Sequence, residues 1–188
     1  MILYLHGFRS SPQSAKAQLF QQALQVRGMA DQLLLPHLPS SPKDAITLCL
    51  ELIQDTPKEN LCIVGSSLGG YYATYLAETL DCRSVCINPS TYAARDLATQ
   101  LEVRTQYHSD SPFVFKAEYI KELADLFVPK IQPQRYLLLA GQQDELLDWQ
   151  EMQARFAGAQ QILAPDQDHA FSGFEHYLPI VLDFIFKD

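Results

Sequence analysis

The chain has 188 residues, of which 47% are hydrophobic, and a formal net charge of −8. This length and apolar content favour one globular domain over residues 1–188 and argue against a disordered chain. Because the acidic excess is spread along the sequence without a basic cluster, we do not expect binding to nucleic acid. No apolar run approaches the length of a membrane span, so membrane insertion is not expected either.

Short apolar runs alternate along the chain with segments of helical periodicity. Strands are predicted at Ile2–Leu5, Gln32–Leu35, Leu61–Gly65, Ser84–Ile87, Arg135–Ala140 and Gln160–Leu163. Helices are predicted at Ser14–Arg27, Lys43–Asp55, Leu68–Leu80, Phe115–Leu126, Trp149–Phe156 and Phe174–Phe186. Strands such as Tyr136–Ala140 are apolar throughout, which is typical of a parallel sheet covered on both faces. We therefore predict an α/β fold of about six mostly parallel strands with helices on both faces.

The amino terminus lacks the basic and apolar regions of a signal peptide, so none is expected. The four cysteines show no Cys-x-x-Cys pair and the histidines no metal-ligand spacing. We therefore expect a cytoplasmic protein with free thiols and with neither a metal nor an organic cofactor. Nothing in the sequence indicates an oligomeric state. The cysteines are Cys49, Cys62, Cys82 and Cys86.

The strongest functional signal lies where the strand Leu61–Gly65 meets the next helix. The sequence there reads Gly-Ser-Ser-Leu-Gly, a Gly-x-Ser-x-Gly motif in the strand–turn–helix context of a nucleophile elbow. Ser67 is the candidate nucleophile, because the serine before it has no glycines two residues to either side. Gly65 and Gly69 flank it, since side chains there would collide across the turn. Taken alone, the motif also fits a glycine-rich turn without chemistry.

A serine hydroxyl needs a base that takes its proton during attack. His169, after the last predicted strand, is the candidate base because imidazole titrates near neutral pH, although a surface loop histidine is the simpler interpretation of that residue alone. A carboxylate should orient the imidazole. Asp144, just beyond the Arg135–Ala140 strand, is preferred, while Asp148 is also suited to cap the helix starting at Trp149. The remaining candidate acids are Glu145, Asp166 and Asp168.

The first strand ends in His6-Gly7-Phe8. Gly7 would let the backbone turn its N–H groups toward Ser67, so we expect the Phe8 and Leu68 N–H groups to form an oxyanion hole. The His6 side chain is expected to support this loop rather than act as a base.

Several stretches together resemble the small bacterial esterase family called YqiA, over nearly the whole chain. The resemblance implies a compact α/β-hydrolase that lacks the first two strands of the larger fold, together with esterase activity. It supports Ser67 as nucleophile and His169 as base, and it places the acid in the loop after the Tyr136–Ala140 strand, where Asp144 matches better. The stretches are Leu5–Phe8 with Ser10–Pro12, Gly65–Thr74, Asn88-Pro89 and Asp168–Phe174.

The middle of the chain departs from this family. Relatives carry an Asn-Pro-Tyr-Thr-Gly-like stretch, whereas this chain reads Gln106–Phe113. Since an insertion here often forms a lid in α/β-hydrolases, residues 90–130 are a candidate for a small helical lid. Its aromatic residues either line an acyl pocket or pack the lid onto the sheet. They are Tyr92, Tyr107, Phe113, Phe115 and Tyr119.

These features predict a serine carboxylesterase that works through an acyl-enzyme. The expected partner is a small-molecule acyl ester or thioester. The first alternative is an acyl thioesterase of the acyl-CoA type with the same triad. The second is a non-catalytic binding module that kept the fold and lost the chemistry.

Overall fold

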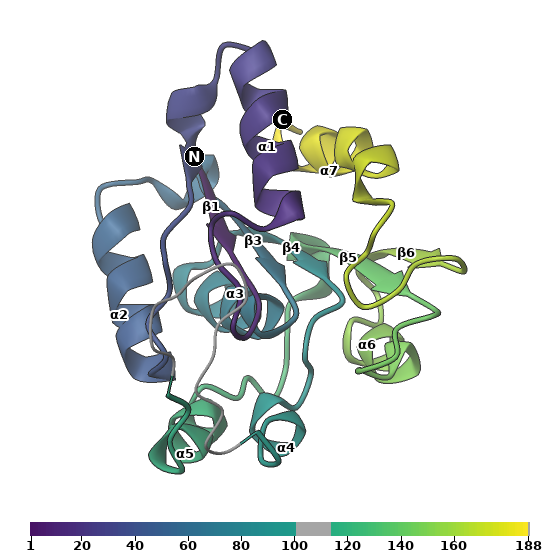
Figure 1. Cartoon of the computed structure of the whole chain (residues 1–188). Coiled ribbons are helices and arrows are strands. Elements are labelled where there is room, and N and C mark those ends of the chain that lie inside the picture. Colours follow the sequence, from purple (N-terminus) through teal and green to yellow (C-terminus); the bar gives the residue numbers. More distant parts are fainter. Residues whose placement is uncertain (101–113, 188) are drawn as a thin grey trace.

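The computed structural model describes residues 1–100 and 114–187 of the chain. Its centre is a six-stranded sheet of order β2-β1-β3-β4-β5-β6, in which every neighbouring pair is parallel (Figure 1). All six predicted strands form, and the sheet confirms the predicted parallel architecture. The strands are β1 (Ile2–Leu5), β2 (Leu33–Leu34), β3 (Cys62–Ser66), β4 (Arg83–Ile87), β5 (Tyr136–Gly141) and β6 (Gln160–Ala164).

Helices cover both faces of the sheet, with α1 and α7 on one side and α2, α3 and α6 on the other (Figure 1). No helix in the described part of the chain is long and apolar enough to cross a bilayer. The helices are α1 (Ala15–Val26), α2 (Pro42–Ile53), α3 (Leu68–Leu80), α4 (Ala93–Asp96), α5 (Glu118–Asp125), α6 (Trp149–Arg155) and α7 (Leu178–Ile185). Short 3₁₀ turns lie at Ala30–Gln32, Lys58–Asn60, Pro133–Arg135 and Phe174–His176.

The last predicted helix is divided in the structure. A 3₁₀ turn at Phe174–His176 precedes α7, and Pro179 occupies the first turn of α7. A proline has no N–H to donate and its ring clashes with the preceding turn, so a continuous helix through Pro179 is disfavoured. The predicted helix at Phe115–Leu126 also begins later, at Glu118.

The alternation of side chains along each strand divides the core into two layers. In β1, Ile2 and Tyr4 pack with α1 and α7, whereas Leu3 and Leu5 pack with α2 and α3. Because both faces are covered, every residue of β1, β3 and β5 is buried. This arrangement accounts for the uniformly apolar strands of the sequence.

The strand order determines at which edge of the sheet a crevice opens. The chain runs from β1 through α1 to β2 on one side of β1, and then through α2 to β3 on the other side. Such a reversal opens a crevice beyond the carboxyl ends of the two central strands. The loop after β1 and the elbow after β3 therefore lie side by side.

The predicted lid at 90–130 includes α4 and α5, and residues 101–113, with Tyr107 and Phe113, lie outside the described part. Phe115 and Tyr119 are buried in the core layer on the α3 side. Tyr92 stacks on Phe127 with 6.0 Å between the ring centroids. Phe115 and Tyr119 therefore pack onto the fold rather than line an acyl pocket, whereas Tyr92 is 42% exposed.

Candidate active site

Ser67 lies at the tight turn between β3 and α3. Its backbone has φ 56° and ψ −121°, a conformation that a residue with a Cβ rarely adopts. The surrounding packing allows only glycine at two positions of the turn. A Cβ on Gly65 would lie 2.1 Å from the carbonyl oxygen of Gly69, and one on Gly69 would lie 2.1 Å from that of Leu5. The two glycines thus let α3 start directly against the ends of β1 and β3.

The side chains of Ser67, His169 and Asp144 form one chain of hydrogen bonds. His169 Nε2 lies 3.1 Å from Ser67 Oγ, and His169 Nδ1 lies 2.8 Å from the nearer carboxylate oxygen of Asp144. The Asp144 side chain is fully buried and that of His169 is 18% exposed. A histidine held between a hydroxyl and a buried carboxylate can accept the hydroxyl proton while its other nitrogen keeps a proton.

Backbone groups fix the Asp144 carboxylate. The amides of Leu146 and Leu147 donate to its Oδ1 atom, at 2.9 and 2.8 Å. The neighbouring Glu145 accepts a hydrogen bond from the His169 amide at 3.0 Å, so this loop holds the histidine at two points.

The other acidic candidates have different contacts. Asp148 is the N-cap of α6, as its position suggested, and accepts from the Gln150 amide. Asp168 accepts from the amide and hydroxyl of Ser172. Among the acids weighed from the sequence, Asp144 is the one whose carboxylate contacts the His169 ring.

The loop after β1 lies against the elbow. A Cβ on Gly7 would lie 3.2 Å from Ser67 Cβ and 3.7 Å from its Oγ, so the backbone here comes as close to the hydroxyl as glycine permits. Phe8 and Leu68 line the same cleft as Ser67 and His169. Leu68 is the first residue of α3, where helix amides lack intrahelical acceptors and favour negative charge.

His6 joins two loops. Its Nε2 accepts from the Leu38 amide at 3.0 Å, and its Nδ1 lies 2.9 Å from the carbonyl oxygen of Gly7. The ring is therefore a neutral imidazole with its proton on Nδ1. Burial lowers the pKa of His6 to about 4, with a smaller contribution from His37 nearby.

Asn88 is a site residue whose role the sequence did not indicate beyond its place at a strand end. It is fully buried, and its amide nitrogen donates to the carbonyl oxygens of Asp168 and His169 at 2.8 and 3.1 Å. Its side-chain oxygen accepts from the Gly141 amide at 2.7 Å. The side chain thus ties β4 to the two loops that carry Asp144 and His169.

Unusual backbone conformations gather around this edge. Positive φ angles at residues other than glycine occur in the loops after β1, β3, β4 and β6. Such conformations persist where the surrounding structure enforces them, and they cluster at functional sites. The residues are Arg9, Ser67, Asn88 and Phe171.

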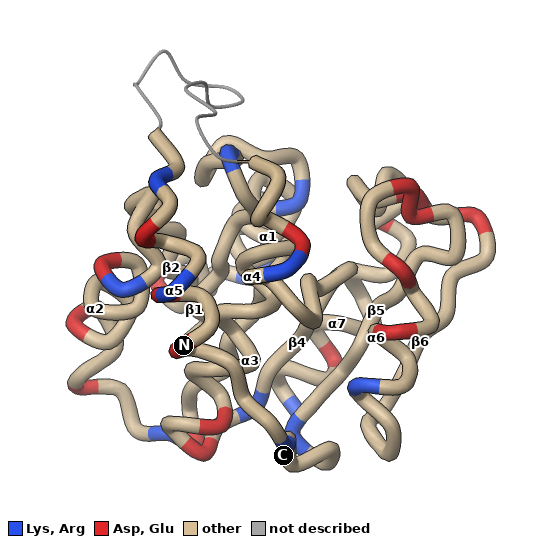
Figure 2. The backbone as a smooth tube through the Cα atoms, turned by 90° about the horizontal axis from the view of Figure 1, so that it is seen from below, with Lys and Arg blue, Asp and Glu red and all other residues tan. Residues whose placement is uncertain are grey.

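A cleft of about 480 Å³ opens beside Ser67 and His169. Leucine side chains from α3, from the end of α4 and from the loop that carries Asp144 form part of its wall, and polar side chains including Arg9, Ser90 and Asp96 form much of the rest. Basic and acidic positions are interspersed over the elements around it rather than gathered into one basic patch (Figure 2). The leucines are Leu68, Leu97, Leu146 and Leu147.

The family model described as "Uncharacterised protein family (UPF0227)" matches residues 1–186. The chain belongs to this family. A UPF0227 protein of Pectobacterium atrosepticum is 25% identical over 184 residues, which are 95% of this chain and 94% of the relative. The UPF0227 protein YcfP of Salmonella paratyphi A is 27% identical over the same shares of the two chains. The predicted resemblance to a YqiA-type family is consistent with this membership.

Solved structures similar to this UPF0227 chain share the α/β-hydrolase fold. Mouse alpha/beta hydrolase domain-containing protein 10 has a TM-score of 0.72 and 18% identity, over 97% of this chain and 89% of that protein. Est1E of Butyrivibrio proteoclasticus, solved with ferulic acid bound, has a TM-score of 0.70 and 14% identity, over 99% of this chain and 89% of that protein. At these identities the likeness establishes the fold, which is the predicted one.

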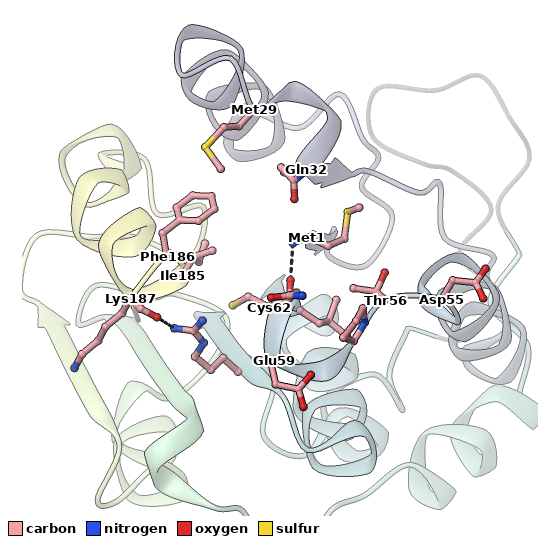
Figure 3. Close-up of a pocket in the computed structure, with 14 residues that line it drawn as sticks. Met1, Met29, Gln32, Asp55, Thr56, Glu59, Cys62, Ile185, Phe186 and Lys187 are labelled. Carbon is pink, nitrogen blue, oxygen red and sulfur yellow. Dashed lines mark hydrogen bonds between the residues drawn. The ribbon is translucent and has the colours of Figure 1, made fainter.

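A larger hollow of about 640 Å³ lies at the opposite end of the sheet (Figure 3). Figure 3 shows Met1, whose amino group donates to the Asn60 carbonyl at 2.5 Å, and Cys62 in its wall. Burial raises the pKa of the Cys62 thiol well above its ordinary value. Among the described residues that line this hollow there is no serine or histidine, so it offers no serine–histidine pair.

Proposed function

We propose that this UPF0227 protein is a serine carboxylesterase. The observation that carries the proposal is the hydrogen-bonded series from Ser67 through His169 to the buried Asp144 carboxylate, at the carboxyl edge of the sheet. The α/β-hydrolase fold of the chain is compatible with several other reactions, so the site rather than the fold supports the assignment.

In the proposed reaction, Ser67 Oγ attacks the ester carbonyl carbon while His169 Nε2 takes the hydroxyl proton. Asp144 stabilises the imidazolium that forms. The negative charge that develops on the carbonyl oxygen is stabilised by the N–H groups of Phe8 and Leu68, and a donor of this kind contributes about 3–4 kcal/mol in the transition state. His169 then protonates the leaving alcohol, and a water molecule activated by the same histidine releases the acid.

The leucine-lined cleft is the proposed site of the acyl chain. Its volume of about 480 Å³ and the side chains of Leu97, Leu146 and Leu147 suit a short apolar acyl group. Phe8, which lines the same cleft, is fixed by an edge-to-face contact with the buried Phe115 at 5.1 Å between ring centroids.

Treatment with a small fluorophosphonate, followed by intact-mass measurement, tests the proposal directly. We expect one adduct on the wild type and none on Ser67→Ala, because only an activated serine displaces fluoride from phosphorus at a useful rate. A folded wild type that gains no adduct would contradict the proposal and favour a non-catalytic binding module.

A panel of matched oxygen esters and thioesters then distinguishes a carboxylesterase from an acyl thioesterase of the acyl-CoA type. Both reactions use the same triad, so the adduct experiment does not separate them. Higher kcat/KM for the oxygen esters is the expected result. A preference for the thioesters would assign the protein to the second class.

We also propose that the protein works in the cytoplasm. All four cysteines are buried free thiols, and Cys82 and Cys86 lie close enough to Cys62 to add to the rise that burial causes in the pKa of its thiol. Neighbouring unpaired thiols are typical of a reducing compartment. Fractionation of the native host cell, followed by detection of the protein in each fraction, tests this location.

A further inference from the structure

A second cleft, of about 300 Å³, adjoins the leucine-lined cleft at Ser67. Ser67, His169 and Phe8 line both, so the two clefts meet at the reacting atoms. The wall of the second cleft comes from β1 and from the start of α1, which lies over β1 in Figure 1. Its polar side chains include Tyr4, Ser10, Ser14, Lys16 and Ser66.

Two hydroxyl groups in this wall have no hydrogen-bond partner in the described part of the chain. They are those of Tyr4, a residue that is only 1% exposed, and of Ser14. Tyr4 and Ser14 line the same cleft, and an interaction with the Ser14 hydroxyl offsets part of the rise that burial causes in the pKa of Tyr4. An unsatisfied buried hydroxyl costs about 1–3 kcal/mol, and a ligand oxygen that reaches the buried Tyr4 hydroxyl would offset this cost.

Lys16 adds a positive charge to the same wall. Its ammonium group donates to the carbonyl oxygen of Ala170, the residue after His169. Burial lowers the pKa of Lys16 to about 8, although the nearby Asp168 carboxylate favours the charged form. The Asp168 oxygens accept from Ser172, and among the described residues no carboxylate forms an ion pair with Lys16. Two of its three N–H donors are therefore available to a bound anion.

The amino end of α1 lines the same cleft through Ser14, Ala15 and Lys16. Ser14 is the N-cap of this 12-residue helix, but its side chain makes no capping hydrogen bond, and the first turn holds no acidic residue. The first amides of a helix have no intrahelical acceptor, and the helix dipole places partial positive charge there. Backbone amides, a lysine and hydroxyl groups at one helix terminus are the donors that bind phosphate and carboxylate groups.

We infer that the second cleft binds the alcohol part of the substrate, and that this alcohol carries a phosphate or carboxylate group. The inference rests on the proposed esterase function. An ester bound at Ser67 extends in two directions from its carbonyl carbon, and the leucine-lined cleft suits the acyl direction. The leaving oxygen must stay within reach of His169, which lines both clefts, so with the acyl chain in the leucine-lined cleft the alcohol extends into the polar one.

Three butyrate esters that differ only in the alcohol test the inference: those of glycerol, of glycerate and of glycerol 3-phosphate. We expect kcat/KM to be at least about tenfold higher for one or both anionic esters, as one or two charge-assisted hydrogen bonds predict. The two anionic arms distinguish a carboxylate from a phosphate. Equal kcat/KM for all three esters would overturn the inference while leaving the esterase function intact.

Single substitutions in the second cleft test whether its residues cause the preference for anionic esters. Tyr4→Phe removes one hydroxyl that has no partner in the fold, and Lys16→Met removes the charge; each should lower the preference for the anionic ester several-fold. Lys121→Met, a matched change at an exposed lysine of α5, should leave the preference unchanged. A preference that survives in both Tyr4→Phe and Lys16→Met would place the anion elsewhere and overturn the inference.

Binding to the Ser67→Ala protein gives a readout that needs no catalysis. Calorimetric titration with glycerol 3-phosphate, glycerate and glycerol should show at least about tenfold tighter binding of an anionic alcohol than of glycerol. If the wild type hydrolyses no ester but Ser67→Ala still binds glycerol 3-phosphate, the esterase proposal fails and the anion site stands. If Ser67→Ala binds neither anionic alcohol and the wild type hydrolyses the three esters with equal kcat/KM, the anion site is overturned while the esterase function stands.

Discussion

The side-chain amide of Asn88 donates a hydrogen bond to the backbone carbonyl of His169, with 3.1 Å between the two atoms. The two residues are 81 positions apart in the chain. Since the same side chain accepts from the Gly141 amide, it joins the end of β5 to the loop after β6. We regard Asn88 as a positioning residue that acts on the proposed reaction through His169.

Asn88→Ala should lower kcat for ester hydrolysis about tenfold or more and change KM little, because the histidine loop loses its anchor. The free energy of unfolding should fall by about 2–4 kcal/mol, as the Gly141 amide loses its acceptor and alanine is disfavoured at a φ of 41°. Asn88→Gly is the matched control, since glycine accepts this φ. It should recover about 1–2 kcal/mol of stability but not the lost kcat. A folded Asn88→Ala protein with wild-type kcat would exclude this role.

Asp144→Asn should lower kcat about 10³–10⁴-fold, because a neutral amide neither stabilises the imidazolium nor enforces the tautomer of His169 that accepts the Ser67 proton. Asp148→Asn, four residues away, is the control. Asp148 caps α6 through the Gln150 amide, and asparagine caps a helix about as well as aspartate, so kcat and Tm should stay near the wild type. Steady-state hydrolysis of p-nitrophenyl acetate measures both. Equal turnover by the two variants would count against Asp144 as the acid.

Gly65→Ala should destabilise the elbow through steric overlap. The added Cβ would lie 2.1 Å from the carbonyl oxygen of Gly69, which is backbone and has little room to move. We expect a loss of about 3 kcal/mol or more in the free energy of unfolding, as for overpacking of a tight interior. Gly28→Ala tests backbone strain without steric overlap. Nothing lies within 4 Å of the added Cβ, but the backbone φ is +69°, which alanine rarely adopts. This substitution should cost only about 1 kcal/mol. Urea unfolding of both variants checks this order.

The sequence predicted the architecture because its strands are uniformly apolar and end in recognisable residues. Ser67, Asp144 and His169 each follow a strand, and parallel strands bring their carboxyl ends to one edge, so the three side chains meet in the structure. The choice of Asp144 over Asp148 was possible because a residue directly before a helix is suited to cap it.

Contacts between side chains of distant segments could not be predicted in the same way. The hydrogen bonds of Asn88 depend on how closely β4 approaches the loop after β6, and no local pattern encodes that distance. Likewise, strand alternation places Tyr4 toward α1, but only the packed structure shows that its hydroxyl lacks a partner. The division of the last helix at Pro179, by contrast, had a local signal in the proline itself.

Stability should depend on pH through His6. Its pKa is about 4 in the folded protein and near 6.5 in an unfolded chain, so the unfolded state takes up the proton first as pH falls. The contribution of neutral His6 is complete above about pH 6.5 and is lost progressively between about pH 6.5 and 4. At about pH 4.5 this loss amounts to roughly 2–3 kcal/mol as an upper bound. Protonation would also displace the Leu38 amide, which donates to Nε2.

Urea unfolding at several pH values between about 7 and 4.5 measures this dependence. The His6→Gln variant lacks the titrating group, so its free energy of unfolding should fall less steeply than that of the wild type over this range. The two proteins differ only at residue 6, so the difference between their curves reports on the His6 imidazole and its surroundings. His176→Gln alters an imidazole that is 79% exposed and should follow the wild-type curve. If the wild-type and His6→Gln curves run parallel, the buried neutral imidazole does not control acid stability.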